Sequence, residues 1–316
     1  MKEKKLLLVG AGPMAVEYYK VLKDLNCDVQ VVGRRESSCV TFEQSTGYMP
    51  SSGGIEEYLS SSELDRDSAI VAVSVEQLAS VTSVLIDNGF KNILVEKPAG
   101  LNVDEIEALS NHANKLKVNV LVAYNRRFYA SVIKAKEIIE ADGGVSSFNF
   151  EFTEWSHVIE PLKKAPGVKE QWLLANSTHV IDLAFYLGGM PKEISCYAGG
   201  KLSWHEKASF AGSGVSKNGA LFNYQANWLA PGRWSVEILT KNSRLIFKPM
   251  EQLHIQKIKT VAIEKVDIDD EIDLKYKAGL YVQTKTFLEG DYQDFQTVED
   301  QAESCLIYEK IAKGSA

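Results

Sequence analysis

Gly10, Gly12 and Ala15 stand at the spacing Gly-x-Gly-x-x-Ala, directly after an apolar run at residues 6–9. In this pattern the first glycine permits a tight turn, the second lets the backbone approach a bound group, and the alanine lets a helix pack close to the strand. The N-terminus of that helix presents free N–H groups and a positive dipole end, which together bind phosphate. The chemistry these residues could perform is therefore the binding of a pyrophosphate.

The pattern alone is a weak signal, because a glycine-rich turn has the same spacing. Its setting is more specific: a buried strand at 6–9 comes before it, a helix is expected over 16–25, and a second strand at 29–32. This order predicts a dinucleotide-binding unit. The residues expected to contact the dinucleotide here are Gly10, Gly12, Pro13, Met14 and Ala15.

The second expected strand ends at Gly33-Arg34-Arg35-Glu36. An NAD-binding chain places an acidic side chain about 20 residues past the glycine turn, where it holds the ribose 2′-hydroxyl. Arg34 stands at that position, and Glu36 comes two residues later. Because a guanidinium suits a 2′-phosphate, the sequence favours NADP(H) over NAD(H), with Arg34 and Arg35 as contacts. The alternative is that both arginines are simply solvated on a loop.

Two more candidate sites directly follow expected strands. Ser74 comes after a strand at 69–73, and Glu96-Lys97-Pro98 comes after a strand at 92–95. Ligands of parallel sheets bind beyond the carboxyl ends of the strands, and a lysine before a proline with fixed φ is placed to meet a ligand. Taken alone, a surface lysine before a turn proline is an equally good interpretation. The predicted cofactor contacts at these sites are Ser74, Glu96, Lys97 and Pro98.

The elements that must position these residues alternate between strand and helix, which predicts an α/β fold with a doubly wound parallel sheet. A Ser- and Gly-rich segment at 41–67 reads as connecting structure with one short helix around 55–59. We predict that residues 1–124 form this nucleotide-binding domain. Its remaining expected elements are helices over 75–89 and 103–116 and a strand at 118–123.

The pattern changes after a helix expected over 130–141, because apolar and polar residues then alternate with period two. This alternation predicts half-buried antiparallel strands that pack one face on helices. Residues 125–316 are therefore expected to form a second α/β domain with a large, open, mainly antiparallel sheet. Its other face is rich in Asn, Gln and aromatic residues, which suits a homodimer or homotetramer. The expected elements are strands at 148–152, 222–228, 234–238 and, more weakly, 261–263, and a C-terminal helix over 298–312.

Composition narrows the function classes. The net charge of −7 and the absence of a basic stripe argue against a nucleic-acid partner. No apolar run is long enough to span a membrane, and residues 1–5 do not resemble a signal peptide. The four cysteines and five histidines show no metal-ligand spacing, so no metal is expected. We expect a cytoplasmic protein with reduced thiols and a small-molecule substrate.

Four motifs occur in order along nearly the whole chain: Gly10-Ala11-Gly12-Pro13-Met14-Ala15, Glu96-Lys97-Pro98-Ala99-Gly100, Tyr124-Asn125-Arg126-Arg127-Phe128 and His179-Val180-Ile181-Asp182-Leu183. This set resembles the glucose–fructose oxidoreductase / inositol dehydrogenase (Gfo/Idh/MocA) family. The resemblance implies an N-terminal Rossmann domain and hydride transfer between a nicotinamide and a carbon of a sugar, polyol or nucleotide-sugar. It also implies that Lys97 contacts cofactor and substrate, that His179 faces the reacting hydroxyl, and that the Lys97–Pro98 peptide bond is cis.

One position departs from the family pattern. Many dehydrogenases of the family carry an aspartate four residues before this histidine, whereas the chain has Ala175 there. A carboxylate that would orient the imidazole is therefore missing, and Asn176 or another polar group would have to substitute. His179 and Asp182 stand at i and i+3 of one expected helix. The candidates for substrate binding or support are Asn125, Arg126, Trp172, Asn176 and Asp182.

The hypothesis is an NADP(H)-dependent oxidoreductase acting on a hydroxyl/keto pair, with Lys97 and His179 as its catalytic residues. In the oxidation direction, His179 would take the hydroxyl proton while Lys97 holds the same oxygen. Two alternatives stay open. One is a non-catalytic NAD(P)-binding sensor or regulator with the same fold, which the loss of the aspartate at Ala175 favours. The other is an enzyme that reduces and reoxidises its NAD within one turnover.

Overall fold

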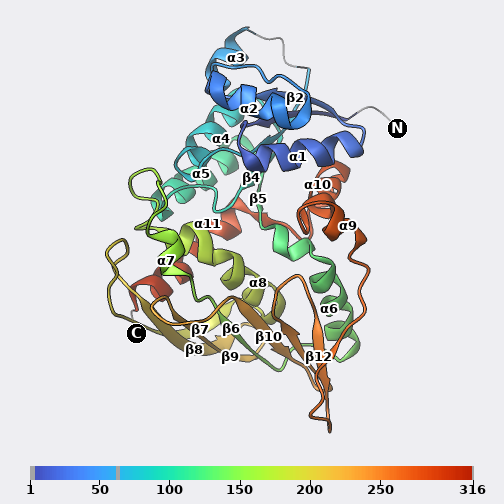
Figure 1. Cartoon of the computed structure of the whole chain (residues 1–316), viewed down its shortest axis with the longest axis vertical. Coiled ribbons are helices and arrows are strands. Elements are labelled where there is room, and N and C mark those ends of the chain that lie inside the picture. The colour runs from blue at the N-terminus through green and yellow to red at the C-terminus, as the bar shows by residue number, and fades with distance from the viewer. Residues whose placement is uncertain (1–3, 62–64, 315–316) are drawn as a thin grey trace. The chain divides into compact units, whose positions relative to one another are not determined.

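The computed structural model describes residues 4–61 and 65–314 (Figure 1). Residues 1–3, placed above in the N-terminal segment, and 62–64, placed in the Ser-rich connection, lie outside the described residues, as do 315–316. The chain forms two compact units. Unit 1 comprises Met1–Asn125 and Lys275–Glu303, and unit 2 comprises Arg126–Leu274 and Ser304–Ala316.

Unit 1 is built on a six-stranded sheet with the order β14-β5-β4-β3-β1-β2. All neighbours pair in parallel except β14, which runs antiparallel to β5. Leu6, Leu7 and Leu8 of β1 are fully buried because both faces of a parallel sheet are covered. The predicted doubly wound sheet is confirmed. Its strands are β1 (Lys5–Val9), β2 (Asp28–Val32), β3 (Ser68–Val71), β4 (Asn92–Glu96), β5 (Asn119–Ala123) and β14 (Gln296–Thr297).

The helices of unit 1 show which local signals the sequence carries. α5 begins after Asn102, whose side chain accepts a hydrogen bond from the Glu105 backbone N–H at 2.9 Å, and it has the predicted bounds. Segment 41–67 was predicted as connecting structure, and this is wrong for its first part, which belongs to α2. That helix buries only Cys39 and Phe42, so it shows little apolar periodicity. The helices are α1 (Pro13–Asp24), α2 (Glu36–Thr46), α3 (Ile55–Ser61), α4 (Leu78–Asp87), α5 (Val103–Leu116) and α10 (Leu280–Glu289), with a 3₁₀ turn at Val75–Gln77.

The segment Lys275–Glu303 packs with the first 125 residues, although the sequence analysis placed it in the second domain. Its short strand β14 adds to the edge strand β5, and α10 contacts α1. This segment therefore groups with unit 1, and not with the second domain in which the sequence analysis placed it. The pairing of β14 with β5 joins residues about 175 positions apart in the chain, and no local pattern signals it.

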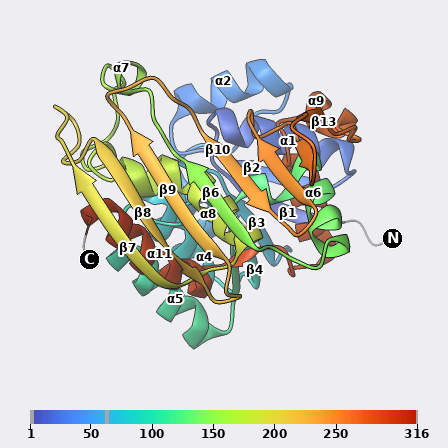
Figure 2. The same cartoon turned by 90° about the horizontal axis from the view of Figure 1, so that it is seen from below.

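Unit 2 is built on an eight-stranded sheet with the order β13-β12-β11-β10-β6-β9-β8-β7. Figure 2 shows β7, β8, β9, β6 and β10 side by side in that order. Only β6 and β9 pair in parallel, so the predicted mainly antiparallel sheet is confirmed. The strands are β6 (Ser147–Glu151), β7 (Pro191–Gly199), β8 (Ser209–Ser216), β9 (Leu221–Asn227), β10 (Ser235–Leu239), β11 (Ser243–Phe247), β12 (His254–Lys257) and β13 (Glu264–Lys265).

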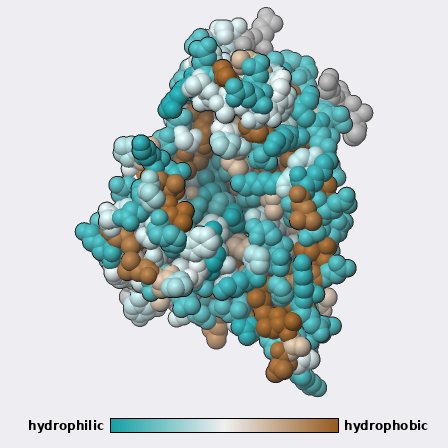
Figure 3. Space-filling view, in the orientation of Figure 1, coloured by the Kyte–Doolittle hydropathy of each residue, from teal (hydrophilic) through white to brown (hydrophobic). Residues whose placement is uncertain are grey.

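The alternating strands at 148–152, 222–228 and 234–238 exist within a residue or two of their predicted bounds. The weaker strand predicted at 261–263 is wrong, because this stretch is the loop between β12 and β13. Its alternation reflects exposed apolar side chains instead of a buried face: Val261 is 94% and Ile263 is 58% exposed. Brown apolar surface appears near β12 at the lower end of the molecule in Figure 3.

One face of this sheet packs on α8, which contacts β6 and β10. Phe148 and Phe150 of β6 meet Phe185 of α8 edge to face and stack on Phe222 and Tyr224 of the neighbouring strand. This aromatic layer explains the period-two pattern of the sequence. The remaining helices are α6 (Ala130–Ala141), α7 (Ser156–Ile159), α8 (Thr178–Gly188), α9 (Glu271–Lys275) and α11 (Val298–Lys313), with a 3₁₀ turn at Asn125–Phe128 and a π-helical turn at Leu173–Ser177.

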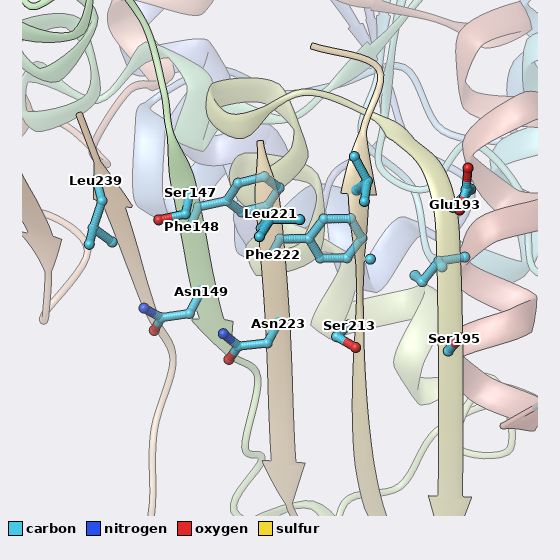
Figure 4. A pocket seen from close by; sticks show the side chains of 13 residues that line it. Ser147, Phe148, Asn149, Glu193, Ser195, Ser213, Leu221, Phe222, Asn223 and Leu239 are labelled. Carbon is cyan, nitrogen blue, oxygen red and sulfur yellow. The ribbon is translucent and has the colours of Figure 1, made fainter. Parts of the chain in front are cut away.

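The opposite face carries a row of polar side chains in register across four strands. Asn149 pairs with Asn223, Asn223 with Ser213, and Ser213 with Ser195. Figure 4 shows these side chains in line along a shallow depression of 650 Å³. This is the face that the sequence analysis expects to associate with another subunit.

Within the described ranges, no helix is long and apolar enough to cross a membrane.

Candidate functional site

The turn after β1 is shaped by Gly10. Its φ is +128°, and its N–H donates to the Val32 carbonyl at 2.8 Å. A Cβ at this position would lie 2.3 Å from the carbonyl oxygen of Ala72, which directly follows the neighbouring strand β3. Only glycine meets both conditions, so the turn is fixed by backbone packing against β3.

The next residues form the N-terminus of α1. Gly12 is its N-cap residue and Pro13 its first helical residue, where the missing N–H of proline costs nothing. A Cβ on Gly12 would meet no atom within 4 Å, so space lies open above this backbone. Ala15 is fully buried where the helix packs on the sheet. An open space in front of a helix N-terminus fits the pyrophosphate of a dinucleotide.

Arg34 and Arg35 follow β2 with exposed side chains, and Arg35 is the N-cap residue of α2. The Gly54 N–H donates to the Gly33 carbonyl at 3.0 Å, which ties the next loop to this one. Gln77, with its side-chain oxygen turned towards Arg34, accepts hydrogen bonds from that guanidinium. Two guanidinium groups beside a helix N-terminus form a positive edge of unit 1.

Glu96 ends β4 and has a fixed environment. The Tyr18 hydroxyl donates to its Oε1 at 2.8 Å from α1. Burial raises the pKa of Glu96, while the Tyr18 hydrogen bond and the charges of Lys97 and Lys277 oppose that rise. Burial and the Glu96 charge together raise the pKa of Tyr18 well above its usual range. Lys277 also reaches the Sδ atom of Met14 at 3.0 Å, so two predicted cofactor residues have a common neighbour.

The Lys97–Pro98 turn is fixed by a hydrogen bond from a buried side chain. Its peptide bond is cis, which confirms that expectation. The fully buried Gln301 donates through Nε2 to the Pro98 carbonyl at 3.2 Å and to the Tyr124 hydroxyl at 3.1 Å. Lys97 itself is half-buried at the carboxyl end of the sheet. Ser74 lies at the equivalent end of β3, where its hydroxyl donates to Glu76.

In unit 2, His179 lies in the first turn of α8, half-buried, and a π-helical turn comes directly before it. The buried carboxylate of Glu154 holds that turn: its Oε1 accepts from Asn176 Nδ2 at 2.9 Å and from Ser177 Oγ at 2.8 Å. Ala175 belongs to the same turn. A carboxylate is thus present beside the segment where the family pattern expects one, but it comes from the loop after β6.

Trp234 is the centre of a cluster that the sequence analysis did not predict. Its ring centroid lies 6.1 Å from that of His179, and the guanidinium carbons of Arg126 and Arg233 lie 4.9 Å and 4.5 Å from it. Arg233 Nη1 is also 3.6 Å from Glu154 Oε2. We call these five residues the Trp234 cluster. They come from four segments between residues 126 and 234, so no short motif in the sequence indicates them.

An open cavity of 590 Å³ adjoins this cluster. Glu154, Trp155 and Gly232 line it, and the Trp155 indole N–H donates to the Gly232 carbonyl at 2.8 Å. The Arg233 guanidinium also covers the Trp155 ring at 4.7 Å. Aromatic walls with a few polar groups are typical of small-molecule sites.

Three other predicted substrate residues have structural partners. Asp182 is 3% exposed and accepts from Arg127 Nε at 2.9 Å and Nη2 at 2.6 Å. Burial alone would lower the pKa of Arg127, but the Asp182 charge and hydrogen bonds raise it. Asn125 donates to the Ala278 carbonyl at 2.9 Å, and Trp172 packs edge to face on Trp204. The structure thus brings Arg126 and His179 together around Trp234, whereas Lys97 belongs to unit 1.

Comparisons with known proteins agree with this architecture. Residues 4–124 match the Gfo/Idh/MocA family, described as "Oxidoreductase family, NAD-binding Rossmann fold". No curated protein matches the chain. Among solved structures, levoglucosan dehydrogenase in complex with NADH and levoglucosan shares 17% identity, with a TM-score of 0.81 over 99% of this chain and 97% of that one.

Two further solved structures are similar over nearly their whole length. UDP-N-acetylglucosamine 3-dehydrogenase GnnA from Acidithiobacillus ferrooxidans shares 14% identity, with a TM-score of 0.76 over 100% of this chain and 98% of that one. A protein of Desulfitobacterium hafniense described as an NADPH-dependent oxidoreductase shares 17% identity, with a TM-score of 0.80 over 99% of this chain and 96% of that one. At these identities, the likeness establishes the fold of both units.

Proposed function

Because residues 4–124 match the Gfo/Idh/MocA oxidoreductase family with its NAD-binding Rossmann fold, we propose that the chain is a nicotinamide-dependent sugar oxidoreductase. Its substrate is the hydroxyl or keto carbon of a sugar, polyol or nucleotide-sugar. The observation that carries this proposal is the turn at Gly10 and Gly12, whose backbone leaves open space before a helix N-terminus. Levoglucosan dehydrogenase and GnnA, which share the fold, are named for substrates of these classes.

Different residues of unit 1 contact different parts of the cofactor. The pyrophosphate binds at Gly10, Gly12 and Pro13, and Met14 and Ala15 continue the same helix. The contacts at the ends of the neighbouring strands are Ser74, Glu96, Lys97 and Pro98. When bound, the nicotinamide supplies the acceptor or donor of a hydride. The preferred cofactor is NADP(H), because Arg34 and Arg35 bring two guanidinium groups to the end of β2, where a 2′-hydroxyl would require an acidic partner.

Lys97 and His179 are the proposed catalytic residues. In the oxidation direction, the hydroxyl proton goes to the His179 imidazole as the carbon gives up its hydride, so that a carbonyl forms. Lys97 donates a hydrogen bond to the same oxygen and stabilises the negative charge that develops on it. Glu154 fixes the turn before His179 through Asn176 and Ser177, which supports an ordered imidazole despite the alanine at position 175.

A second candidate is a sensor that binds the cofactor without turnover, and Ala175 is the observation that favours it, since the usual aspartate is missing. An enzyme that recycles its nicotinamide within one turnover is a variant of the first proposal. Two readouts, nicotinamide absorbance and product formation, distinguish the three. Net change of nicotinamide absorbance indicates a dehydrogenase, product without net change indicates recycling, and no product indicates a sensor.

We also propose that the sheet face with the Asn149–Ser195 row joins subunits into a homodimer or homotetramer. The row offers matching donors and acceptors along four strands, which a two-fold related copy can satisfy.

The protein would work in the cytoplasm, since its four cysteines are buried thiols.

The test of the main proposal is turnover of a sugar and polyol panel by the wild-type chain and by Lys97→Met. We expect the substitution to lower kcat/KM by about a hundredfold or more, since it removes a donor to a developing oxyanion. NADPH affinity should change only a few-fold. Full activity in Lys97→Met would contradict the assigned role of this lysine.

A further inference from the structure

Arg126 and Arg127 are neighbours in sequence with opposite surroundings. Arg127 forms a two-pronged ion pair with the buried Asp182. Arg126 forms no hydrogen bond or ion pair through its side chain with any residue in the described ranges, and its contacts are the faces of Trp234 at 4.9 Å and Tyr129 at 5.9 Å. A guanidinium has five N–H donors, so this one presents donors that the chain does not use.

The Trp234 cluster holds more cationic than anionic side chains. Arg233 lies over the same indole ring, at 4.5 Å from its centroid, and repels Arg126. Glu154 is the buried carboxylate of the cluster, and its oxygens are already engaged with Asn176, Ser177 and Arg233. Within the Trp234 cluster, two guanidinium groups therefore lie beside one carboxylate, and the second carboxylate whose charge acts on Arg126 is the exposed Glu251, which forms no ion pair with it.

Burial also acts on the charged form of this group. It lowers the pKa of Arg126, and Arg233 lowers it further, while Tyr129, Glu251 and Glu154 oppose the change. A partly buried guanidinium that forms no direct ion pair or hydrogen bond is costly, so such groups usually have a partner that binds them. The partner that would neutralise this one is an anion brought by a ligand.

We propose that the substrate of this chain carries an anionic group, a carboxylate or a phosphate ester, that binds Arg126 and lies beside Arg233. This inference rests on the proposed function, since it names the substrate class of the same site. A planar guanidinium binds either oxyanion through two parallel hydrogen bonds. The Trp234 ring supports both arginines from behind, which limits their freedom and favours one orientation of the ligand.

The arrangement also suggests how specificity is divided. His179 lies on the same indole ring as the two arginines, with 6.1 Å between ring centroids. An anionic group held by Arg126 would therefore fix one end of a short substrate while a hydroxyl of the same molecule reaches His179. Arg126 is thus a binding residue, and its loss should raise KM far more than it lowers kcat.

The test compares three probes with one ring: D-glucose, D-glucuronate and D-glucose 6-phosphate. Their dissociation constants are measured by ligand-observed NMR on NADPH-saturated protein. The variants are Arg126→Met, Arg126→Lys and, as a matched control, Arg244→Met, which removes an arginine paired with Glu237 on the exposed sheet. Which acid binds shows whether a carboxylate or a phosphate is preferred.

We expect at least one acid to bind about 10- to 100-fold more tightly than glucose, the usual worth of a charge-assisted pair. Arg126→Met should abolish that difference, Arg126→Lys should restore part of it, and Arg244→Met should preserve it. Equal binding of glucose and both acids, no binding of either acid, or an acid preference that survives in Arg126→Met would overturn the inference. NADPH fluorescence on the same samples reports the proposed function separately, because cofactor binding does not depend on Arg126.

Discussion

The turn after β1 and the Trp234 cluster are suited to binding negative charge by different means. The turn offers backbone N–H groups at the start of α1, and its shape depends on Gly10 packing against the Ala72 carbonyl. The cluster offers side chains, two guanidinium groups over one indole ring. A site made of backbone is fixed by the fold of its segment, whereas a site made of side chains can change its ligand through single substitutions.

The difference explains where the two kinds of specificity reside. Dinucleotides share one pyrophosphate, so a backbone turn serves all of them. Substrates differ in charge and hydroxyl pattern, and the cluster draws its side chains from the start of unit 2, the loop after β6, α8 and the segment before β10. None of these four positions belongs to a strand of the sheet. This contrast yields the following predictions, in order of decreasing effect.

The largest expected effect is a difference in stability between variants of the two adjacent arginines. Arg127→Met should lower the free energy of unfolding by about 3–5 kcal/mol, because it leaves the buried Asp182 carboxylate without its partner. Arg126→Met should change it by no more than about 1 kcal/mol, since no carboxylate loses an ion pair. Urea unfolding of both variants measures this. Equal losses would show that Arg126 is a structural residue and would weaken the contrast.

Gly10→Ala should break the backbone site. The added Cβ would lie 2.3 Å from the Ala72 oxygen, and the backbone at this position has a positive φ that alanine rarely adopts. Relieving this strain of about 3 kcal/mol would distort the turn, and the same free energy corresponds to a loss of NADPH affinity of about a hundredfold. Gly89→Ala is the control, because Gly89 has φ +86° but open space around its Cβ position. The control should cost about 1 kcal/mol of stability and leave the affinity unchanged. Unchanged affinity in Gly10→Ala would refute the role of the turn.

The smallest effect comes from His205, which packs at 4.7 Å on the Trp228 wall of the cavity. Burial lowers the pKa of His205, although the Lys207 carbonyl opposes this. The folded state therefore prefers the neutral ring, and its stabilising contribution is complete above the unfolded pKa of about 6.5 and lost as the pH falls through the lower folded pKa. Melting temperatures between pH 7 and pH 5 should fall less in His205→Gln than in the wild type. His157→Gln, which removes an exposed histidine, should follow the wild type.

The same contrast decides what the sequence could predict. The turn is encoded in six consecutive residues, so Gly10 to Ala15 were assigned together, and α5 and α6 were found with their observed bounds because apolar spacing and end signals agree. Strand β8 is not indicated by the sequence, since Ser209–Ser216 contains two glycines and three serines and shows little alternation. Arg233 and Glu154 lie 79 residues apart in the chain and become neighbours only through the pairing of β6 with β10.

The central claim is that unit 1 binds a nicotinamide dinucleotide and prefers the 2′-phosphate form. It is tested most directly by fluorescence titration of NADPH and NADH into the wild-type chain beside Arg34→Asp. The account predicts saturable binding that is about 10-fold or more tighter for NADPH, and loss of that preference in the variant, because one charged contact to the phosphate is removed. Equal or tighter binding of NADH by the wild type would contradict the role of Arg34, and no binding of either nucleotide would contradict the proposed function itself.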